Sequence, residues 1–429
     1  MKKEEKMLVF AVISFFVVKL FLLVPAYSDE NIYFNMAKNM VEKGLIPYRD
    51  FFYAHPPLHI YLLFFTFSIF GESVFIGKLV PLVFSSLCAV LVFFISKEFF
   101  KKDKKIPLIA SLIFLFSPQM LSFSSLAYGM WPAIFWGLLS LYFILDKKPI
   151  LSAFFCTLAI FTRYLLFFYL PILFYFSYKN NTHRKFIFSF LFIFSVFFVT
   201  SSLLFNHSFV KDTILYHLFS KIIYGIRPVI IEYLAMNSPF IFLSLFFLYF
   251  NKKYRLYAIM PLLLDVVILL MFKLSFYHYF LISLPFYSIM AGHLITKTEY
   301  MEAFFVIFLF MIFANMGSIF FNNTASSDLF VAKTFFNNLT KPRLFGDPIV
   351  TNYLAFVSDA KIIGNYFDGD INRLRFENYI FEDIFSNKPD YFIASDYYPI
   401  TYFENLKRYY KKIFQFGSFA NFTVYQIAS

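Results

Sequence analysis

Long apolar runs without charged residues constrain the fold of this chain more than any other feature of its sequence. Most of the 429 residues lie in uncharged runs of about 15–22 residues, the length of a helix that crosses the hydrocarbon core of a bilayer. Hydrophobic residues make up 60% of the chain and charged residues 15%, whereas a soluble domain keeps about a quarter of its residues charged. We therefore expect a polytopic, all-α membrane protein.

The basic residues indicate how the runs cross the membrane. The net charge is +12, but the lysines and arginines gather in short loops between the runs, as in membrane proteins with basic cytoplasmic loops. Nucleic-acid binding is therefore not expected, and contact with phosphate or anionic lipid is a secondary interpretation of the same clusters. The clusters are Lys2–Lys6, Lys97–Lys105, Lys147–Lys148, Lys179–Lys185, Lys252–Arg255 and Lys297.

If every basic cluster is cytoplasmic, the N-terminus lies inside and the chain crosses the plasma membrane about eleven times. The first run exceeds the usual apolar length of a cleaved signal, so it predicts a retained helix. We expect a transmembrane domain over residues 1–321 and a small extracytoplasmic α/β domain over residues 322–429. The predicted spans are 7–27, 74–96, 106–124, 131–145, 149–163, 164–178, 186–205, 237–250, 255–272, 278–295 and 303–321.

The run Leu58–Phe70 does not fit this pattern. It is shorter than a full span and suits an interfacial or re-entrant helix. Counting it as a span would place Lys97–Lys105 outside, against the charge rule. We therefore expect an interfacial helix within a first outer loop of residues 28–73.

Apolar density drops in the C-terminal region, where Asn, Asp and Lys become frequent. Helical periodicity occurs over Asn372–Ser386, and five short segments have the composition of strands. Together they predict the small α/β domain. The strand segments are Pro348–Thr351, Lys361–Ile363, Tyr391–Ala394, Ile413–Phe416 and Thr423–Ile427.

The first outer loop opens with an amphipathic segment. Apolar side chains recur at helical spacing between residues 32 and 41. Ser28 is placed to cap this helix, and Gly44 to end it. Asp29 and Glu30 suit the positive end of the helix dipole. On these residues alone, a helix cap is the favoured interpretation of the acidic pair over catalysis.

A stiff connector follows. Three prolines between residues 47 and 57 restrict the backbone, and the last two start the short apolar helix. Arg49, Asp50 and His55 lie on this connector, close in sequence to the acidic pair. Carboxylates, an imidazole and a guanidinium at one lipid–water boundary are the groups that phosphate-ester chemistry needs. The alternative is that Asp50 only pairs with Arg49.

In this order, the residues resemble the C-type integral-membrane glycosyltransferases, which include protein O-mannosyltransferases and the lipid A aminoarabinose transferase. The resemblance covers about 55 residues, and the plan of about eleven helices with a C-terminal extracytoplasmic domain is similar too. Within that domain, the stretch Lys388–Ile393 is also similar. The residues that carry the resemblance are Lys19, Asp29-Glu30, Gly44, Pro47-Tyr48-Arg49-Asp50-Phe51, His55-Pro56-Pro57-Leu58 and Phe70-Gly71.

The resemblance implies an inverting transfer of one sugar from a polyprenyl or dolichyl phosphate to an acceptor on the outer face. Asp29 matches the catalytic acidic position and would take the proton of the acceptor, with Glu30 orienting the acceptor or the base. His55, Arg163 and Lys19 match basic positions, where they would stabilise the charge of the leaving phosphate. The structural alternatives are a helix-start residue for His55 and an interfacial anchor for Arg163.

Further charged residues are candidates. His217, Lys221 and Arg227 lie in a long outer loop and are candidate contacts to the donor phosphate, with solvated surface charge as the stronger alternative. His278 matches the family pattern loosely. Asp265 falls in the middle of a span, where a functional acid and a buried hydrogen-bonded acid are equally good interpretations.

The sequence departs from the family in the short outer loop Ser125–Trp131, which has no carboxylate where many relatives have one. A divalent metal needs clustered oxygen ligands, so we expect a metal-independent enzyme, with Asp29, Glu30 and Asp50 as the remaining candidate ligands.

A transporter or a flippase for lipid-linked glycans is the alternative function, but it predicts internal repeats and paired midplane charges that the sequence does not show. Neither the sugar nor the acceptor is specified. The acceptor is a protein, a glycolipid or a glycan.

Overall fold

The computed structural model divides into two compact units. The first, here the helical unit, comprises Met1–Leu23, Lys78–Thr200 and Ile222–Ile319, and the second, here the mixed unit, comprises Val24–Gly77, Ser201–Lys221 and Phe320–Ser429. The structure describes residues 2–205, 208–219, 240–241, 244–245, 247–248, 255–271, 277–297, 326–368, 383–384, 386–396, 398, 409–417 and 421–428. The domain boundary at residue 321 stays a prediction.

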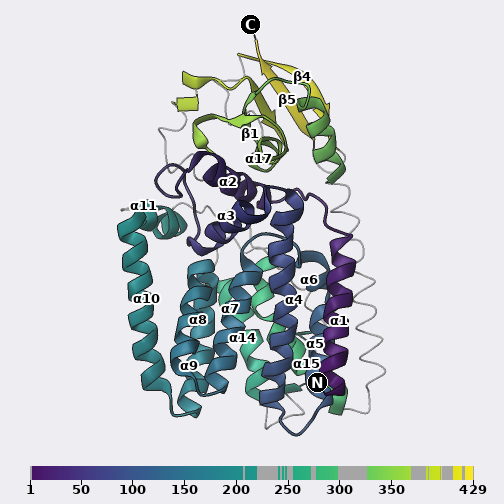
Figure 1. Cartoon of the computed structure of the whole chain (residues 1–429), viewed down its shortest axis with the longest axis vertical. Coiled ribbons are helices and arrows are strands. Elements are labelled where there is room, and N and C mark those ends of the chain that lie inside the picture. The colour runs from purple at the N-terminus through teal and green to yellow at the C-terminus, as the bar shows by residue number, and fades with distance from the viewer. Residues whose placement is uncertain are drawn as a thin grey trace. The chain divides into compact units, whose positions relative to one another are not determined.

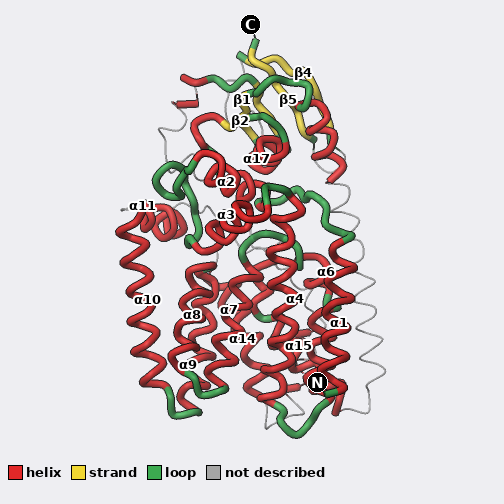
Figure 2. The backbone as a smooth tube through the Cα atoms, in the orientation of Figure 1, coloured by secondary structure: helices red, strands yellow, loops and turns green. Residues whose placement is uncertain are grey.

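Helices form the described part of the helical unit (Figures 1 and 2). Within the described residues, α4 and α10 are both long and apolar enough to cross a membrane. The predicted count of eleven spans is therefore not confirmed, and the predicted spans 237–250 and 303–321 lie largely or wholly outside the described residues. The helices are α1 (Lys3–Leu20), α4 (Val74–Phe99), α5 (Lys105–Leu115), α6 (Pro118–Phe123), α7 (Met130–Leu145), α8 (Pro149–Thr162), η1 (Tyr164–Tyr169), α9 (Leu170–Lys179), α10 (His183–Phe205), α14 (Arg255–Met271), η4 (Tyr277–Ile282) and α15 (Leu284–Lys297).

The predicted span 106–124 is divided into α5 and α6 at a local stop signal. The hydroxyl of Ser117 accepts a hydrogen bond from the backbone N–H of Met120, and Pro118 occupies the first position of α6. A Ser cap followed by Pro favours a new helix start at this point.

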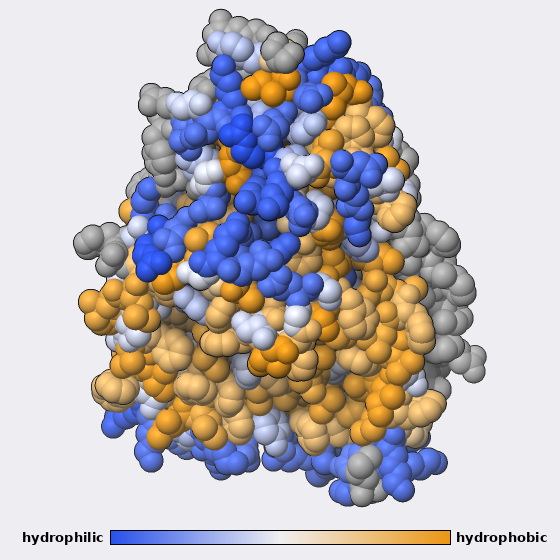
Figure 3. Space-filling view, turned by 45° about the horizontal axis from the view of Figure 1, so that its top comes forward, coloured by the Kyte–Doolittle hydropathy of each residue, from blue (hydrophilic) through white to orange (hydrophobic). Residues whose placement is uncertain are grey.

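Small residues bring neighbouring helices of this unit together. A Cβ atom on Gly292 of α15 would lie 2.8 Å from the backbone nitrogen of Ala110 in α5, so the two backbones are in direct contact. The hydroxyl of Ser140 in α7 lies 3.0 Å from that of Ser152 in α8. Such contacts are typical of helices packed in a bilayer. Much of the outer surface of these helices is apolar (Figure 3).

The mixed unit combines the first outer loop, residues 201–221 and the C-terminal region. The helix α3 has the predicted bounds, and its interfacial position stays a prediction. The helix α2 ends, as predicted, at Gly44, which has a φ of 65° and donates its N–H to the carbonyl of Met40 at 3.1 Å. The helices are α2 (Glu30–Lys43), α3 (Leu58–Phe70), α11 (Ser208–Val210), η2 (Lys211–Leu215, a π-helical turn), α12 (Tyr216–Phe219) and α17 (Pro348–Val357).

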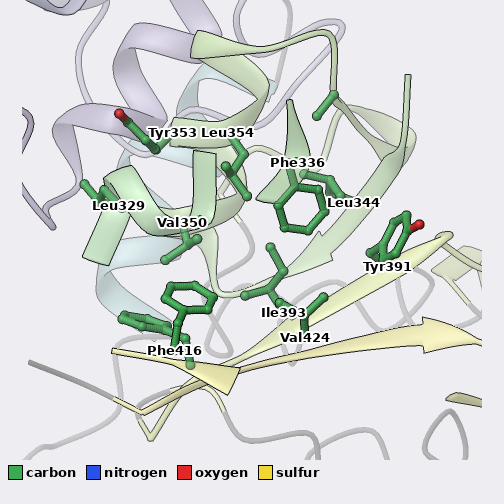
Figure 4. Packing of buried hydrophobic residues seen from close by; sticks show 13 residues of the cluster. Leu329, Phe336, Leu344, Val350, Tyr353, Leu354, Tyr391, Ile393, Phe416 and Val424 are labelled. Carbon is green, nitrogen blue, oxygen red and sulfur yellow. The ribbon is translucent and has the colours of Figure 1, made fainter. Parts of the chain in front are cut away.

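A five-stranded sheet of order β2-β1-β3-β5-β4 forms the C-terminal part. The strand β1 is parallel to β2 and β3, and β5 is antiparallel to β3 and β4. Leu344, Ile393 and Val424 of the sheet pack against Val350 and Leu354 of α17 to form a buried core (Figure 4). The strands are β1 (Arg343–Gly346), β2 (Lys361–Ile362), β3 (Tyr391–Ala394), β4 (Tyr410–Phe416) and β5 (Phe422–Ile427).

The small C-terminal sheet confirms the predicted α/β character, with one segment wrong and one strand missed. Residues 348–351 form the start of α17 rather than a strand, because Asp347 caps the helix by accepting the N–H groups of Ile349 and Val350. The missed strand is β1. Most of the predicted helix 372–386 lies outside the described residues.

Candidate active site

The helix α2 carries the acidic pair at its start. Asp29 occupies the N-cap position, so the prediction that Ser28 caps the helix is wrong by one residue. The carboxylate of Asp29 is exposed and makes no capping hydrogen bond, whereas Glu30 is buried. Capping therefore does not account for the carboxylate of Asp29.

One turn along α2, Tyr33 connects this helix to His55. The hydroxyl of Tyr33 lies 2.9 Å from Nε2 of His55. The backbone N–H of Tyr33 donates to the carbonyl of Asp29 at 3.3 Å, so the two residues are one helical turn apart. The sequence pattern placed Tyr33 on the apolar face, and its polar contact with His55 was not predicted.

His55 and His217 lie side by side. Their rings stack at a centroid distance of 5.8 Å and an interplanar angle of 28°. Nε2 of His217 donates to the carbonyl of Ala54 at 2.7 Å, and since a carbonyl only accepts, this nitrogen carries a proton. Two histidines that were predicted separately as contacts to the donor phosphate are thus brought together.

The segment that carries His217 includes a π-helical turn, η2, a feature frequent at functional sites. It packs on the connector through Tyr216, whose ring lies 5.0 Å from that of Phe52. Asp212 is buried within the π turn and was missed by the sequence reasoning. The signal for it was a lone carboxylate between Lys211 and Thr213 in the long outer loop.

Tyr48 holds the backbone of His55. Its hydroxyl donates to the carbonyl of His55 at 2.5 Å, and its ring packs against Phe205 and Phe209. The φ of Tyr48 is 66°, a left-handed conformation that is strained for a residue with a side chain. Strain of this kind persists where the surrounding contacts fix it, often at functional sites.

Arg49 and Asp50 form a bidentate ion pair, with Nη2 of Arg49 2.8 Å from a carboxylate oxygen of Asp50. This hydrogen bonding from Arg49 holds the pKa of Asp50 below its usual range, assisted by the backbone N–H of Ile46. This ion pair is the contact expected from the alternative interpretation, in which Asp50 only pairs with Arg49.

The remaining described candidates belong to the helical unit. Lys19 is buried and donates to the carbonyl of Leu121 at 2.7 Å. Arg163 follows α8 directly and is 9% exposed. Lys78, buried near the start of α4, is a cation that the sequence reasoning missed within a predicted span.

His278 packs against Tyr128, with ring centroids 4.7 Å apart. The carboxylate of Asp265 accepts a hydrogen bond from the hydroxyl of Tyr287 at 2.6 Å, as the interpretation of a buried, hydrogen-bonded acid requires. Lys221 and Arg227 lie outside the described residues.

The C-terminal part of the mixed unit holds the first outer loop through polar contacts. The hydroxyl of Tyr27 donates to the carboxylate of Asp347 at 2.7 Å, and the amide of Asn35 donates to Asn352 at 2.9 Å. Burial raises the pKa of Asp347, although hydrogen bonds from Ser395 and Tyr27 oppose this shift. The α/β part thus holds the chain on both sides of Asp29, at Tyr27 before it and at Asn35 within α2.

Asp29, Glu30 and Asp50 are the candidate metal ligands that the sequence offers. Within the ranges that the structure describes, no three His, Cys, Asp or Glu side chains gather in a way that would hold a metal ion. The assignment of Asp29 and Glu30 as metal ligands stays a prediction.

Two solved structures share this fold along the whole chain. ArnT from Cupriavidus metallidurans, bound to undecaprenyl phosphate, is 14% identical, with a TM-score of 0.65 over 99% of this chain and 98% of its own. The Archaeoglobus fulgidus oligosaccharyltransferase AglB, in complex with an inhibitory peptide and a dolichol-phosphate, is 11% identical, with a TM-score of 0.56 over 100% of this chain and 75% of its own.

At the level of sequence, the profile of the family described as GPI transamidase subunit PIG-U matches residues 35–227, and no curated protein matches the chain. The matched residues begin after the acidic pair. ArnT is an aminoarabinose transferase, and both solved neighbours are glycosyltransferases of the C type. The chain therefore has the fold of the C-type integral-membrane glycosyltransferases, as the resemblance of its first outer loop predicted.

Proposed function

We propose that this chain is an inverting glycosyltransferase that moves one sugar from a polyprenyl phosphate to an acceptor at the outer face of the plasma membrane. One observation carries the proposal. His55, from the sequence motif, stacks on His217 and contacts Tyr33, one turn from the exposed carboxylate of Asp29.

Asp29 is the proposed general base. The acceptor hydroxyl attacks the anomeric carbon while its proton passes to the carboxylate of Asp29. The bond between this carbon and the phosphate oxygen breaks, and the lipid phosphate leaves with the electron pair. Attack from the opposite side inverts the configuration.

The leaving phosphate gains negative charge, which nearby donors stabilise in the transition state. His55 and His217 are the proposed phosphate contacts from the mixed unit, because the stacked rings bring two imidazoles, each able to donate an N–H, to one place. Arg163 and Lys19 are proposed as further phosphate contacts on the sequence resemblance, which His278 matches loosely. Lys221 and Arg227 are proposed for their positive charge in the long outer loop.

The match to the PIG-U profile favours a second candidate, a subunit of a larger complex without transferase chemistry of its own. A transporter or flippase is the third candidate, and no observation favours it over the others. The bound lipids of the solved neighbours, undecaprenyl phosphate and dolichol-phosphate, support a lipid-linked donor.

A transfer assay separates these candidates. Purified protein in liposomes receives polyprenyl phosphates that carry radiolabelled hexoses or pentoses, together with membrane extracts as acceptors. Transfer that is lost in His55→Ala and His217→Ala supports the proposal. Translocation of the lipid without transfer indicates a flippase, and binding without either reaction indicates a non-catalytic subunit.

A further inference from the structure

The helical unit contains a basic pocket of about 540 Å³ at the ends of several helices. Its walls come from the end of α4 and the loop after it, the ends of α7, α9 and α15, and the start of α5. These segments include three of the basic clusters that the charge rule places in the cytoplasm. The volume is within the range of pockets that hold small ligands.

The charge of the lining is positive. The lining contains four lysines and two carboxylates, so its net formal charge is +2 with the histidine neutral. Lys297 pairs with Asp103 at 2.6 Å, and Lys101 pairs with Glu98 at 3.0 Å. Both carboxylates are therefore paired. The other two lysines, Lys102 and Lys179, have no carboxylate within ion-pair distance in the described part of the chain.

The carbonyl groups at the ends of α7 and α9 have other hydrogen-bond donors and do not need these two lysines. The last carbonyls of α7 accept the backbone N–H of Lys148 at 2.8 Å and the side-chain amide of Asn180 at 2.8 Å. At the end of α9, the carbonyl of Ser177 accepts the backbone N–H of Thr182 at 2.8 Å. The ammonium groups of Lys102 and Lys179 thus remain for a ligand.

The pocket also has apolar walls. The rings of Phe99 and Phe176 stack at 5.3 Å, and Phe100 lies 4.6 Å from the ring of His293. Lysines beside aromatic walls suit a molecule with a negative head and an apolar body. Basic pockets between the ends of membrane helices bind anionic lipid head groups in this way.

We propose that this pocket binds a phosphate ester, specifically the head group of an anionic phospholipid, through Lys102 and Lys179. The proposal is independent of the transferase chemistry, because none of the candidate catalytic residues lines the pocket.

The test is native mass spectrometry of the full chain in detergent, titrated with phosphatidylglycerol, phosphatidylcholine or inorganic phosphate. The pocket variant is Lys102→Gln/Lys179→Gln. The matched control is Lys3→Gln/Lys185→Gln, which removes two exposed lysines elsewhere on the helical unit. Thermal unfolding without lipid confirms that both variants fold.

We expect phosphatidylglycerol to bind the pocket variant about 30-fold more weakly than the unmodified chain, since each lysine near a membrane surface contributes about a factor of five. The control should keep its affinity. Equal loss in the control, or equal affinity for phosphatidylcholine, would overturn the proposal. If inorganic phosphate binds by itself and displaces the lipid, the ligand is a free phosphate rather than a lipid head group, and the proposal is overturned.

Discussion

Tyr27 and Asp347 are joined by a 2.7 Å hydrogen bond, although one residue precedes the acidic pair of the first outer loop and the other follows β1. Asp347 is buried and also accepts the hydroxyl of Ser395 at 2.6 Å. Hydrogen bonds to a buried charge are among the stronger ones in proteins. The C-terminal sheet therefore holds the chain two residues before Asp29.

Removing this link should affect both stability and turnover. We expect Tyr27→Phe to lower the free energy of unfolding by about 1–3 kcal/mol, because a buried carboxylate loses a donor. The rate of sugar transfer should fall several-fold with donor affinity retained. Tyr366→Phe is the matched control, since Tyr366 donates to Asp383 at 2.7 Å within the C-terminal part. Equal transfer rates in the two variants would contradict a positioning role for Tyr27.

The buried position of Asp347 also predicts a pH dependence. Burial raises the pKa of Asp347 above that of the unfolded chain, so the folded protein takes up a proton first on acidification. The stability of the unmodified chain relative to Asp347→Asn should therefore rise as the pH falls from neutral through the folded pKa toward about 3.9. Thermal unfolding of both proteins between pH 7 and pH 4 measures this difference. A relative stability that falls over this window would show that hydrogen bonding outweighs burial.

Tyr48 offers a test of how His55 is positioned. Tyr48→Phe removes the hydrogen bond to the carbonyl of His55 but keeps the aromatic packing. We expect transfer to slow several-fold, while stability falls by about 0.5–1.5 kcal/mol. Tyr61→Phe is the control, because Tyr61 stacks on the same Phe205. If both variants keep full activity, the contact between Tyr48 and His55 has no role in turnover.

Gly346 should tolerate no side chain. Its φ is 132°, and a Cβ atom would lie 2.1 Å from the carbonyl oxygen of Ile393 in the neighbouring strand. Backbone strain and the clash together predict a loss of about 3 kcal/mol or more for Gly346→Ala. Gly44→Ala, at a φ of 65° with open space around it, should lose only about 1 kcal/mol. Similar unfolding midpoints for the two variants would contradict this account of the sheet.

Local signals in the sequence predicted much of the fold. Amphipathic spacing and Gly44 predicted α2, and the apolar run after Pro57 predicted α3. The strand-like composition of residues 348–351 was misleading. These residues form a helix because Asp347 caps it and a proline occupies its first position. The strand β1 was missed because Arg343 opens it and Gly346, a residue with low strand propensity, ends it, so that Leu344 and Phe345 alone have a strand-like character.

The site was less accessible to prediction, because its contacts join residues far apart in the chain. The motif predicted His55, but nothing in the sequence indicates that His217 stacks on it. The bond between Tyr27 and Asp347 is likewise a long-range contact. Tyr33 was assigned to the apolar face of α2 without a polar contact, because periodicity reports which face of a helix a residue occupies and not which group its hydroxyl contacts.

The central claim is that the carboxylate of Asp29 takes the proton of the acceptor, and the transfer rate of Asp29→Asn tests it most directly. Glu42→Gln, an exposed carboxylate near the other end of α2, is the matched control. With a radiolabelled polyprenyl-phosphate sugar as donor, we expect transfer by Asp29→Asn to fall by about 10²–10⁴-fold, with donor binding retained. Glu42→Gln should transfer at the unmodified rate. Transfer by Asp29→Asn at the rate of Glu42→Gln would contradict the assignment of Asp29 as the base.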